Sequence, residues 1–97
     1  MGDLRFVCYP AKAAANQRKH RVPFREAQSV FADENALFLA NPDHTEQEER
    51  FLLLGLSVRL RILTVVHTVD DDGDMIRIIS ARKATKRKQQ QYLEKVM

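Results

Sequence analysis

Short runs of hydrophobic residues, separated by turn-forming residues, dominate the second half of the chain. Residues 36–40, 50–57 and 61–69 are rich in Phe, Leu, Ile and Val, and the last of these runs is the most β-prone. A further run covers residues 75–80, and residues 70–74 before it contain Asp-Gly, a strong signal for a hairpin turn. The pattern predicts four successive strands that pair as an antiparallel meander.

The first third of the chain predicts a strand and two helices. Residues 4–9 are predicted to form a short strand that Pro10 ends. Residues 11–20 are rich in Ala, Lys and Arg, which are strong helix formers. Residues 24–31 repeat apolar side chains at helical spacing, and a third helix is expected from about residue 84 to residue 97.

The resulting order, β-α-α-β-β-β-β-α, predicts an α+β fold. We expect an antiparallel sheet of about five strands, with two N-terminal helices and one C-terminal helix packed on one face. The length of 97 residues suits one domain, 1–97, and the 44% hydrophobic content excludes a disordered tail.

Targeting features and cysteine usage point to the cytoplasm. Residues 1–10 lack the long apolar core of a signal peptide, and no apolar run approaches the ~18 residues that span a bilayer. The single cysteine, Cys8, excludes an internal disulfide and is expected to be a small buried hydrophobe. We therefore expect a cytoplasmic protein with no membrane association.

Charge is distributed unevenly beneath a net charge of +3. Residues 4–25 carry six basic side chains and no acid, and residues 82–97 carry six basic side chains against Glu94. The middle of the chain, residues 26–81, has four basic and eleven acidic side chains. Two basic ends predict a surface that faces a polyanion, and the alternative is two solvated helix faces.

Metal-site motifs do not occur in the sequence. His20, His44 and His67 lie far apart, and no Cys or His pair has the spacing of metal ligands. The three glycines are not clustered as in a phosphate-binding loop. The acidic segment 70–74 lacks the spacing and the closing Glu of a calcium loop. We predict no metal site.

Arginine in a strand is the feature that most needs a chemical reason. Arg77 lies within the β-branched run, and Arg82 follows at the expected corner between strand and helix. A buried strand tolerates little charge, so Arg77 either pairs with a carboxylate, Glu48 or Glu49, or faces a site for an anion. The sequence leaves both alternatives open.

Arg77 also suggests a particular chemistry. If the faces of the last two strands match, Arg77 lies near His67, an arrangement suited to gripping a phosphate. RNA cleavage by a 2′-hydroxyl requires a protein to orient the phosphate, stabilise its developing charge and move protons. Clustered arginines would supply the first two functions, and Tyr92 or His20 would help with the third.

Motifs in the same order along nearly the whole chain resemble those of BrnT-type toxins. In the first half they are Pro10-Ala11-Lys12-Ala13-Ala14-Ala15-Asn16, Lys19-His20, Val22 and Phe24 to Asp33. In the second half they are Asp43-His44-Thr45, Glu48-Glu49-Arg50-Phe51 to Gly55-Leu56-Ser57, and the ending from Ile76 to Ala84, which continues to Tyr92.

The resemblance implies a RelE-like fold and a bacterial endoribonuclease, independent of metal and cofactor, that inhibits translation and arrests growth. It also implies a type II toxin–antitoxin system, in which a BrnA-like ribbon-helix-helix antitoxin holds the toxin in a hetero-oligomer. That complex would bind operator DNA through the antitoxin.

Site residues follow from the resemblance position by position. In this superfamily the catalytic groups are mostly basic residues on the sheet and an aromatic or basic residue near the C-terminus. The expected catalytic residues are Arg61, Arg77, Arg82 and Tyr92. The basic residues expected to bind RNA are Lys19, His20, Lys83, Lys86 and Arg87.

The chain departs from the family pattern at several turns. Arg21 and Leu60 stand where glycine is usual, and Cys8-Tyr9 replaces a tryptophan-aspartate pair. Losing glycine at a turn with positive φ would cost ~1 kcal/mol or more. These departures keep open the alternative of a catalytically inactive, toxin-like binding module that acts in an antitoxin repressor complex on DNA.

Overall fold

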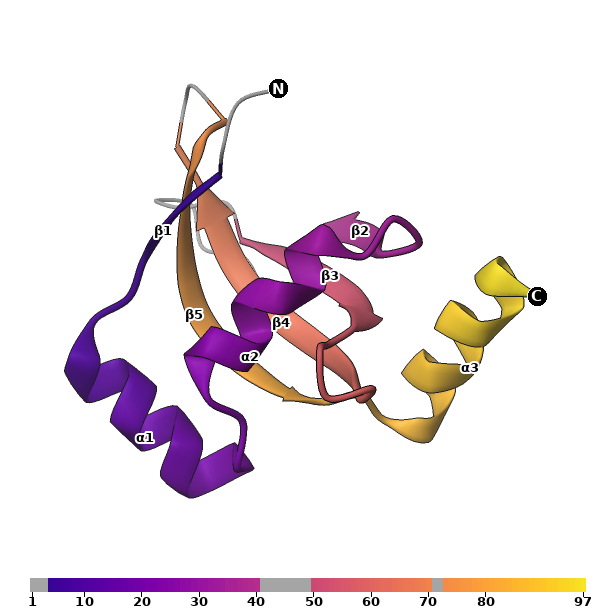
Figure 1. The fold of residues 1–97 in the computed structure, drawn as a ribbon, viewed down its shortest axis with the longest axis horizontal. Helices are drawn as coiled ribbons and strands as arrows, with labels where there is room; N and C mark the ends of the chain where they lie inside the picture. The colour runs from indigo at the N-terminus through magenta and orange to yellow at the C-terminus, as the bar shows by residue number, and fades with distance from the viewer. Residues whose placement is uncertain (1–3, 41–49, 71–72) are drawn as a thin grey trace.

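The computed structural model describes residues 4–40, 50–70 and 73–97, which form a five-stranded sheet with helices at both ends of the chain (Figure 1). The elements are β1 (Arg5–Val7), α1 (Pro10–His20), α2 (Phe24–Ser29), the 3-10 turn η1 (Val30–Ala32), β2 (Leu37–Ala40), β3 (Phe51–Leu56), β4 (Ile62–Val69), β5 (Met75–Lys83) and α3 (Lys86–Val96). The predicted order and the α+β class are confirmed.

The sheet has the strand order β1-β5-β4-β3-β2. Strands β2 to β5 form the predicted antiparallel meander. Strand β1 pairs in parallel with β5, from Arg5 opposite Met75 to Val7 opposite Arg77, and this makes the sheet mixed. The first and last strands of the chain are therefore neighbours.

Strand β5 is longer than predicted and contains Arg82, which does not lie at a corner. Its ladder with β4 continues until Lys83 faces Leu63. The side chain of Asn16 in α1 also pairs with this strand: its Nδ2 donates to the Ala81 carbonyl at 2.8 Å, and its Oδ1 accepts from the Ala81 amide at 3.0 Å. The chain turns only after Lys83.

Arg77 and His67 lie on opposite faces of the sheet, so the prediction that they meet is wrong. Arg77 pairs with Thr68, and His67 pairs with Ile78. His67 is fully buried, with its ring 4.9 Å from that of Phe31, and burial lowers its pKa. His67 is therefore part of an aromatic core.

Two hydrophobic cores lie on opposite faces of the sheet. Leu53 packs with residues of α2, whereas Leu54 packs with Tyr92 of α3. Because consecutive strand residues point to opposite faces, α3 contacts the face opposite to that of α2. The expectation that all helices share one face is wrong, and Figure 1 shows α3 standing apart from α1 and α2.

The turn before β5 has the predicted Asp-Gly chemistry. The Gly73 amide donates to the Asp70 carbonyl at 3.0 Å, and Gly73 has φ 79°. Asp71 and Asp72, like Glu48 and Glu49, lie outside the described residues. Among the helices that are described, none is long and apolar enough to cross a membrane.

Candidate functional site

A β-bulge in β5 brings Arg77 and Arg82 onto one face of the sheet. Two strand residues five positions apart normally point to opposite faces. Here Thr68 pairs with Arg77 and Thr64 pairs with Arg82, with a register shift between them, so that five residues of β5 match four of β4. The extra residue restores the alternation, and both arginines share the face of Thr64 and Thr68.

The two arginines lie at separate points along β5. Their partners are four residues apart, which corresponds to about 13 Å along a strand. Arg82 is exposed, whereas Arg77 is half-buried. The alternative pairing of Arg77 with Glu48 or Glu49 falls on carboxylates outside the described residues. Two cations spaced in this way suit an extended anionic chain better than one small anion.

Arg61 pairs with Glu26, a carboxylate buried at the start of α2. The Arg61 Nε donates to Glu26 Oε2 at 2.9 Å, and its Nη2 donates to Glu26 Oε1. The Glu26 side chain is 2% exposed and that of Arg61 is 25% exposed. This bidentate pair ties the beginning of β4 to α2.

The environment of Glu26 keeps it ionised. Its bonds to Arg61 and to the Ser57 hydroxyl, which donates to Oε2 at 2.6 Å, hold the pKa of Glu26 below its usual value. Arg59 lies 3.9 Å away and adds a weaker attraction. Because Glu26 balances its charge, Arg61 is a fixed, partly exposed cation with a structural role.

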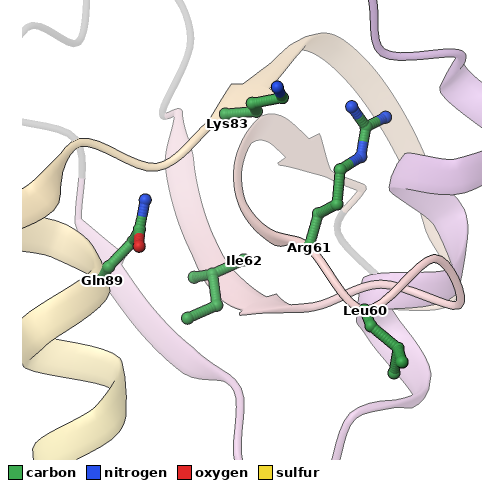
Figure 2. A pocket seen from close by; sticks show the side chains of 5 residues that line it. All are labelled: Leu60, Arg61, Ile62, Lys83 and Gln89. Atoms are coloured by element: carbon green, nitrogen blue, oxygen red, sulfur yellow. The ribbon is translucent and has the colours of Figure 1, made fainter.

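A cavity of about 290 Å³ opens beside Arg61 (Figure 2). The cavity brings together Arg61, a predicted catalytic residue just before β4, and Lys83, a predicted RNA-binding residue at the end of β5. Gln89 of α3 reaches the cavity from the other side, and its Nε2 donates to the Ala84 carbonyl at 2.9 Å. The described residues that line it are Leu60, Arg61, Ile62, Lys83 and Gln89.

Tyr92 lies in the second core, with 4% of its surface exposed. Its hydroxyl donates to Asp33 Oδ2 at 2.5 Å, and the same oxygen accepts from the Leu56 amide at 2.8 Å. Burial and the bond to Asp33 raise the pKa of Tyr92 to about 12. In this arrangement the phenol anchors α3 to the sheet, and its predicted catalytic role stays a prediction.

Lys19 and His20 line a second cavity, of about 270 Å³, at the outer edge of β5. Asn16 holds α1 against this edge and also donates to the Val22 carbonyl at 2.9 Å. Ser80, which lies between the two strand arginines in the sequence, reaches the same cavity. The predicted residues of α1 therefore lie beside β5, in a cavity that has no lining residue in common with the cavity beside Arg61.

The first turn of α3 carries an unusual charge pattern. Lys86, Arg87 and Lys88 are consecutive, and this turn contains no acidic residue. Cations are unfavourable at a helix N-terminus, because the dipole already places partial positive charge there. Thr85 stabilises the helix start by accepting from the Lys88 amide at 3.2 Å. The result is a concentration of positive charge that begins four residues after Arg82 in the chain.

The predicted site residues surround the second half of β5 instead of forming one compact cluster. The two arginines of β5 lie on one face of the sheet, and the predicted residues of α1 lie along the edge of β5. The pocket with Arg61 lies near the end of the strand. Glu26, Asn16 and Gln89 were not predicted as site residues from the sequence. Glu26 looks like an ordinary first-turn acid of a helix, and its partner is 35 residues away, so no local signal identifies it.

Comparisons with known proteins agree with this architecture. Residues 9–88 match the family described as "Ribonuclease toxin, BrnT, of type II toxin-antitoxin system". The fold resembles the crystal structure of the Brucella abortus ribonuclease toxin BrnT, with a TM-score of 0.63 and 19% sequence identity, covering 86% of this chain and 99% of that chain. A comparison with curated proteins found no match.

Proposed function

Because the chain belongs to the BrnT family of ribonuclease toxins of type II toxin–antitoxin systems, we propose that it is an endoribonuclease that cleaves RNA by attack of a 2′-hydroxyl, without a metal. It inhibits translation and arrests growth in the cytoplasm until an antitoxin binds it. The observation that carries this proposal is the run of three cations in the first turn of α3, which begins four residues after Arg82 in the chain.

This charge pattern supports a polyanionic substrate because it opposes helix stability. Each cation at a helix N-terminus costs about 0.3–1 kcal/mol, whereas an acid at the same place would stabilise the helix. If these cations only kept a helix face solvated, they could lie elsewhere along α3 without this cost. The turn is instead suited to attract a phosphate backbone.

The two arginines of β5 would bind the RNA at two different points. Arg82, which is exposed and lies four residues before this turn in the chain, would hold the scissile phosphate and stabilise its developing charge. Arg77, about 13 Å along the strand, would hold the backbone at a second point. Lys19 and His20 would extend the basic surface around the edge of β5, and His20 is the candidate for proton transfer.

The expected partner is a BrnA-like ribbon-helix-helix antitoxin, bound to the toxin in a hetero-oligomer. The match to a type II toxin–antitoxin family supports a proteinaceous antitoxin. The antitoxin, and not the basic surface of this chain, would carry the complex to operator DNA. Arg61 would support RNA binding from its pair with Glu26.

A growth assay tests this function. Expression of the wild-type chain alone should arrest growth and deplete translated transcripts, and co-expression of the adjacent antitoxin gene should restore growth. Arg82→Ala should relieve the arrest at equal protein level, because Arg82 is an exposed strand residue whose loss leaves both cores intact.

The rival function, a non-catalytic binding module, gives a different outcome. Electrostatic binding alone would show steep salt dependence and no cleavage product. Normal growth and intact RNA at high levels of folded wild-type protein would reject the enzyme. Arg77→Lys adds a second criterion, since a point charge tolerates lysine and a bidentate grip on phosphate does not.

A further inference from the structure

We propose that the cavity beside Arg61 is a base-recognition pocket that selects guanine in the RNA substrate. This inference rests on the proposed ribonuclease function and adds a determinant of sequence preference. The cavity, of about 290 Å³, is open to the surface, and its side chains come from β4, β5, α3 and the turn before β4 (Figure 2). Two of its lining residues, Lys83 and Gln89, directly follow the cations Arg82 and Lys88 in the chain, so a nucleotide held there would have its phosphates near those cations.

Arg61 provides a rigid plane for stacking. Its guanidinium is fixed by two bonds to Glu26, and its Nη2 also donates to the Arg21 carbonyl at 3.4 Å. Unpaired bases in RNA complexes commonly stack on arginine planes as well as on aromatic rings. The pair with Glu26 therefore prepares a surface for a base and loses little conformational freedom on binding.

Lys83 and Gln89 provide opposite polarities across the pocket. The Lys83 ammonium group donates hydrogen bonds only. The Gln89 amide nitrogen already donates to the Ala84 carbonyl, which leaves the Gln89 carbonyl oxygen to accept from a ligand. Guanine carries the acceptors O6 and N7 together with an amino donor, and lysine or arginine at O6 and N7 is its commonest specific contact.

Leu60 is an exposed residue at the margin of the pocket, and its backbone conformation is unfavourable. It has φ 62°, a left-handed conformation that is disfavoured for leucine, and 79% of its surface is exposed. Neither packing nor backbone preference explains a leucine at this turn. As an apolar wall beside Ile62 it would shield the edge of a bound base from water, which gives the strained residue a function.

The test measures binding separately from cleavage. Eight-nucleotide 2′-O-methyl oligonucleotides cannot be cleaved, and four of them differ only in a central G, A, C or U within a uridine background. By fluorescence anisotropy, the wild-type protein should bind the G oligonucleotide about tenfold more tightly than the others. Lys83→Met should reduce this preference to about twofold or less.

Lys86→Met is the matched control, because it removes the same charge three residues away and outside the pocket lining. This variant should bind all four oligonucleotides more weakly, by the same factor. Equal wild-type affinity for the four oligonucleotides, or an equal loss of affinity for all four in both variants, would overturn guanine selection. If the wild type still cleaves RNA, the proposed ribonuclease function would stand. Absence of both binding and cleavage would overturn the two together.

Discussion

Arg21 and Leu60 are the two described non-glycine residues with positive φ, at 60° and 62°. Both positions were identified from the sequence as turns where the family pattern has glycine. In this conformation the side chain crowds the following carbonyl, at a cost of roughly 1–2 kcal/mol. Arg21 ends α1 as its left-handed cap, and Leu60 closes the turn between β3 and β4.

Arg21→Gly and Leu60→Gly should each stabilise the protein. Relief of the left-handed strain exceeds the entropy that glycine adds to the unfolded chain, so each change should raise the free energy of unfolding by about 0.5–1 kcal/mol. Urea denaturation measures this difference. Ala14→Gly, at an exposed position in the interior of α1, is the control and should lower stability by about 1 kcal/mol. A loss of stability in either turn variant would contradict the strain assigned to it.

Arg61 is needed for stability apart from any role with RNA. Arg61→Ala leaves the Glu26 carboxylate buried without its bidentate partner, and loss of one member of such a pair costs about 3 kcal/mol. Thermal or urea unfolding of the variant should show this loss. A lower activity of Arg61→Ala must therefore be compared with the fraction of protein that remains folded.

Arg59→Ala is the control for this pair, because the Arg59 side chain is 65% exposed and lies 3.9 Å from the same carboxylate. Its effect should be below about 1 kcal/mol. Adding Glu26→Gln to Arg61→Ala should recover part of the lost stability, since no unpaired buried charge remains. If Arg61→Ala cost no more than Arg59→Ala, the structural role of Arg61 would be wrong.

At the scale of elements, α3 combines a poor helix start with a strong anchor. Its first turn holds three cations, while Tyr92 in its second turn is buried and bonded to Asp33. The anchor, together with the Thr85 cap, keeps the helix in place although its N-terminal charges oppose the helix dipole. Such a conflict between stability and charge is typical of a functional site.

Lys86→Gln and Arg87→Gln should separate stability from RNA binding. Each change removes a cation from the helix N-terminus and should raise the free energy of unfolding by a few tenths of a kcal/mol. Each should also weaken RNA binding and reduce the salt dependence of log Kd by about one. Binding titrations at several salt concentrations, with unfolding curves of the same samples, measure both effects.

Lys95→Gln serves as the control for α3, because Lys95 lies in the last turn, where a cation is favourable, and donates to the Ala36 carbonyl at 3.2 Å. It should lower stability and leave RNA binding nearly unchanged. Tighter RNA binding by the first-turn variants would show that these cations do not face the substrate.

For the whole molecule, the sequence was sufficient to predict the strands, the helices and their order. Apolar runs and turn residues are local signals, and most predicted ends agree with the structure within two residues. The end of β5 differs by three residues, because its last part pairs with β4 and with the Asn16 side chain. Neither of these contacts leaves a mark in the local pattern of residues 75–83.

The arrangement of the site was less predictable, because it depends on register. Alternation alone places Arg77 and Arg82 on opposite faces, and only the bulge between them brings them together. The pair between Glu26 and Arg61 joins segments 35 residues apart. The resemblance to a family made the arginines candidate catalytic residues, while the structure shows them at different places around β5.

Cleavage of RNA by the purified protein in excess EDTA tests the central claim most directly. The wild-type protein should cut a short RNA and leave a 2′,3′-cyclic phosphate, the product of attack by a 2′-hydroxyl. Arg82→Ala, shown to be folded by circular dichroism, should cut it about 100-fold more slowly. Intact RNA with folded wild-type protein, or cleavage that Arg82→Ala leaves unchanged, would contradict a metal-independent ribonuclease centred on β5.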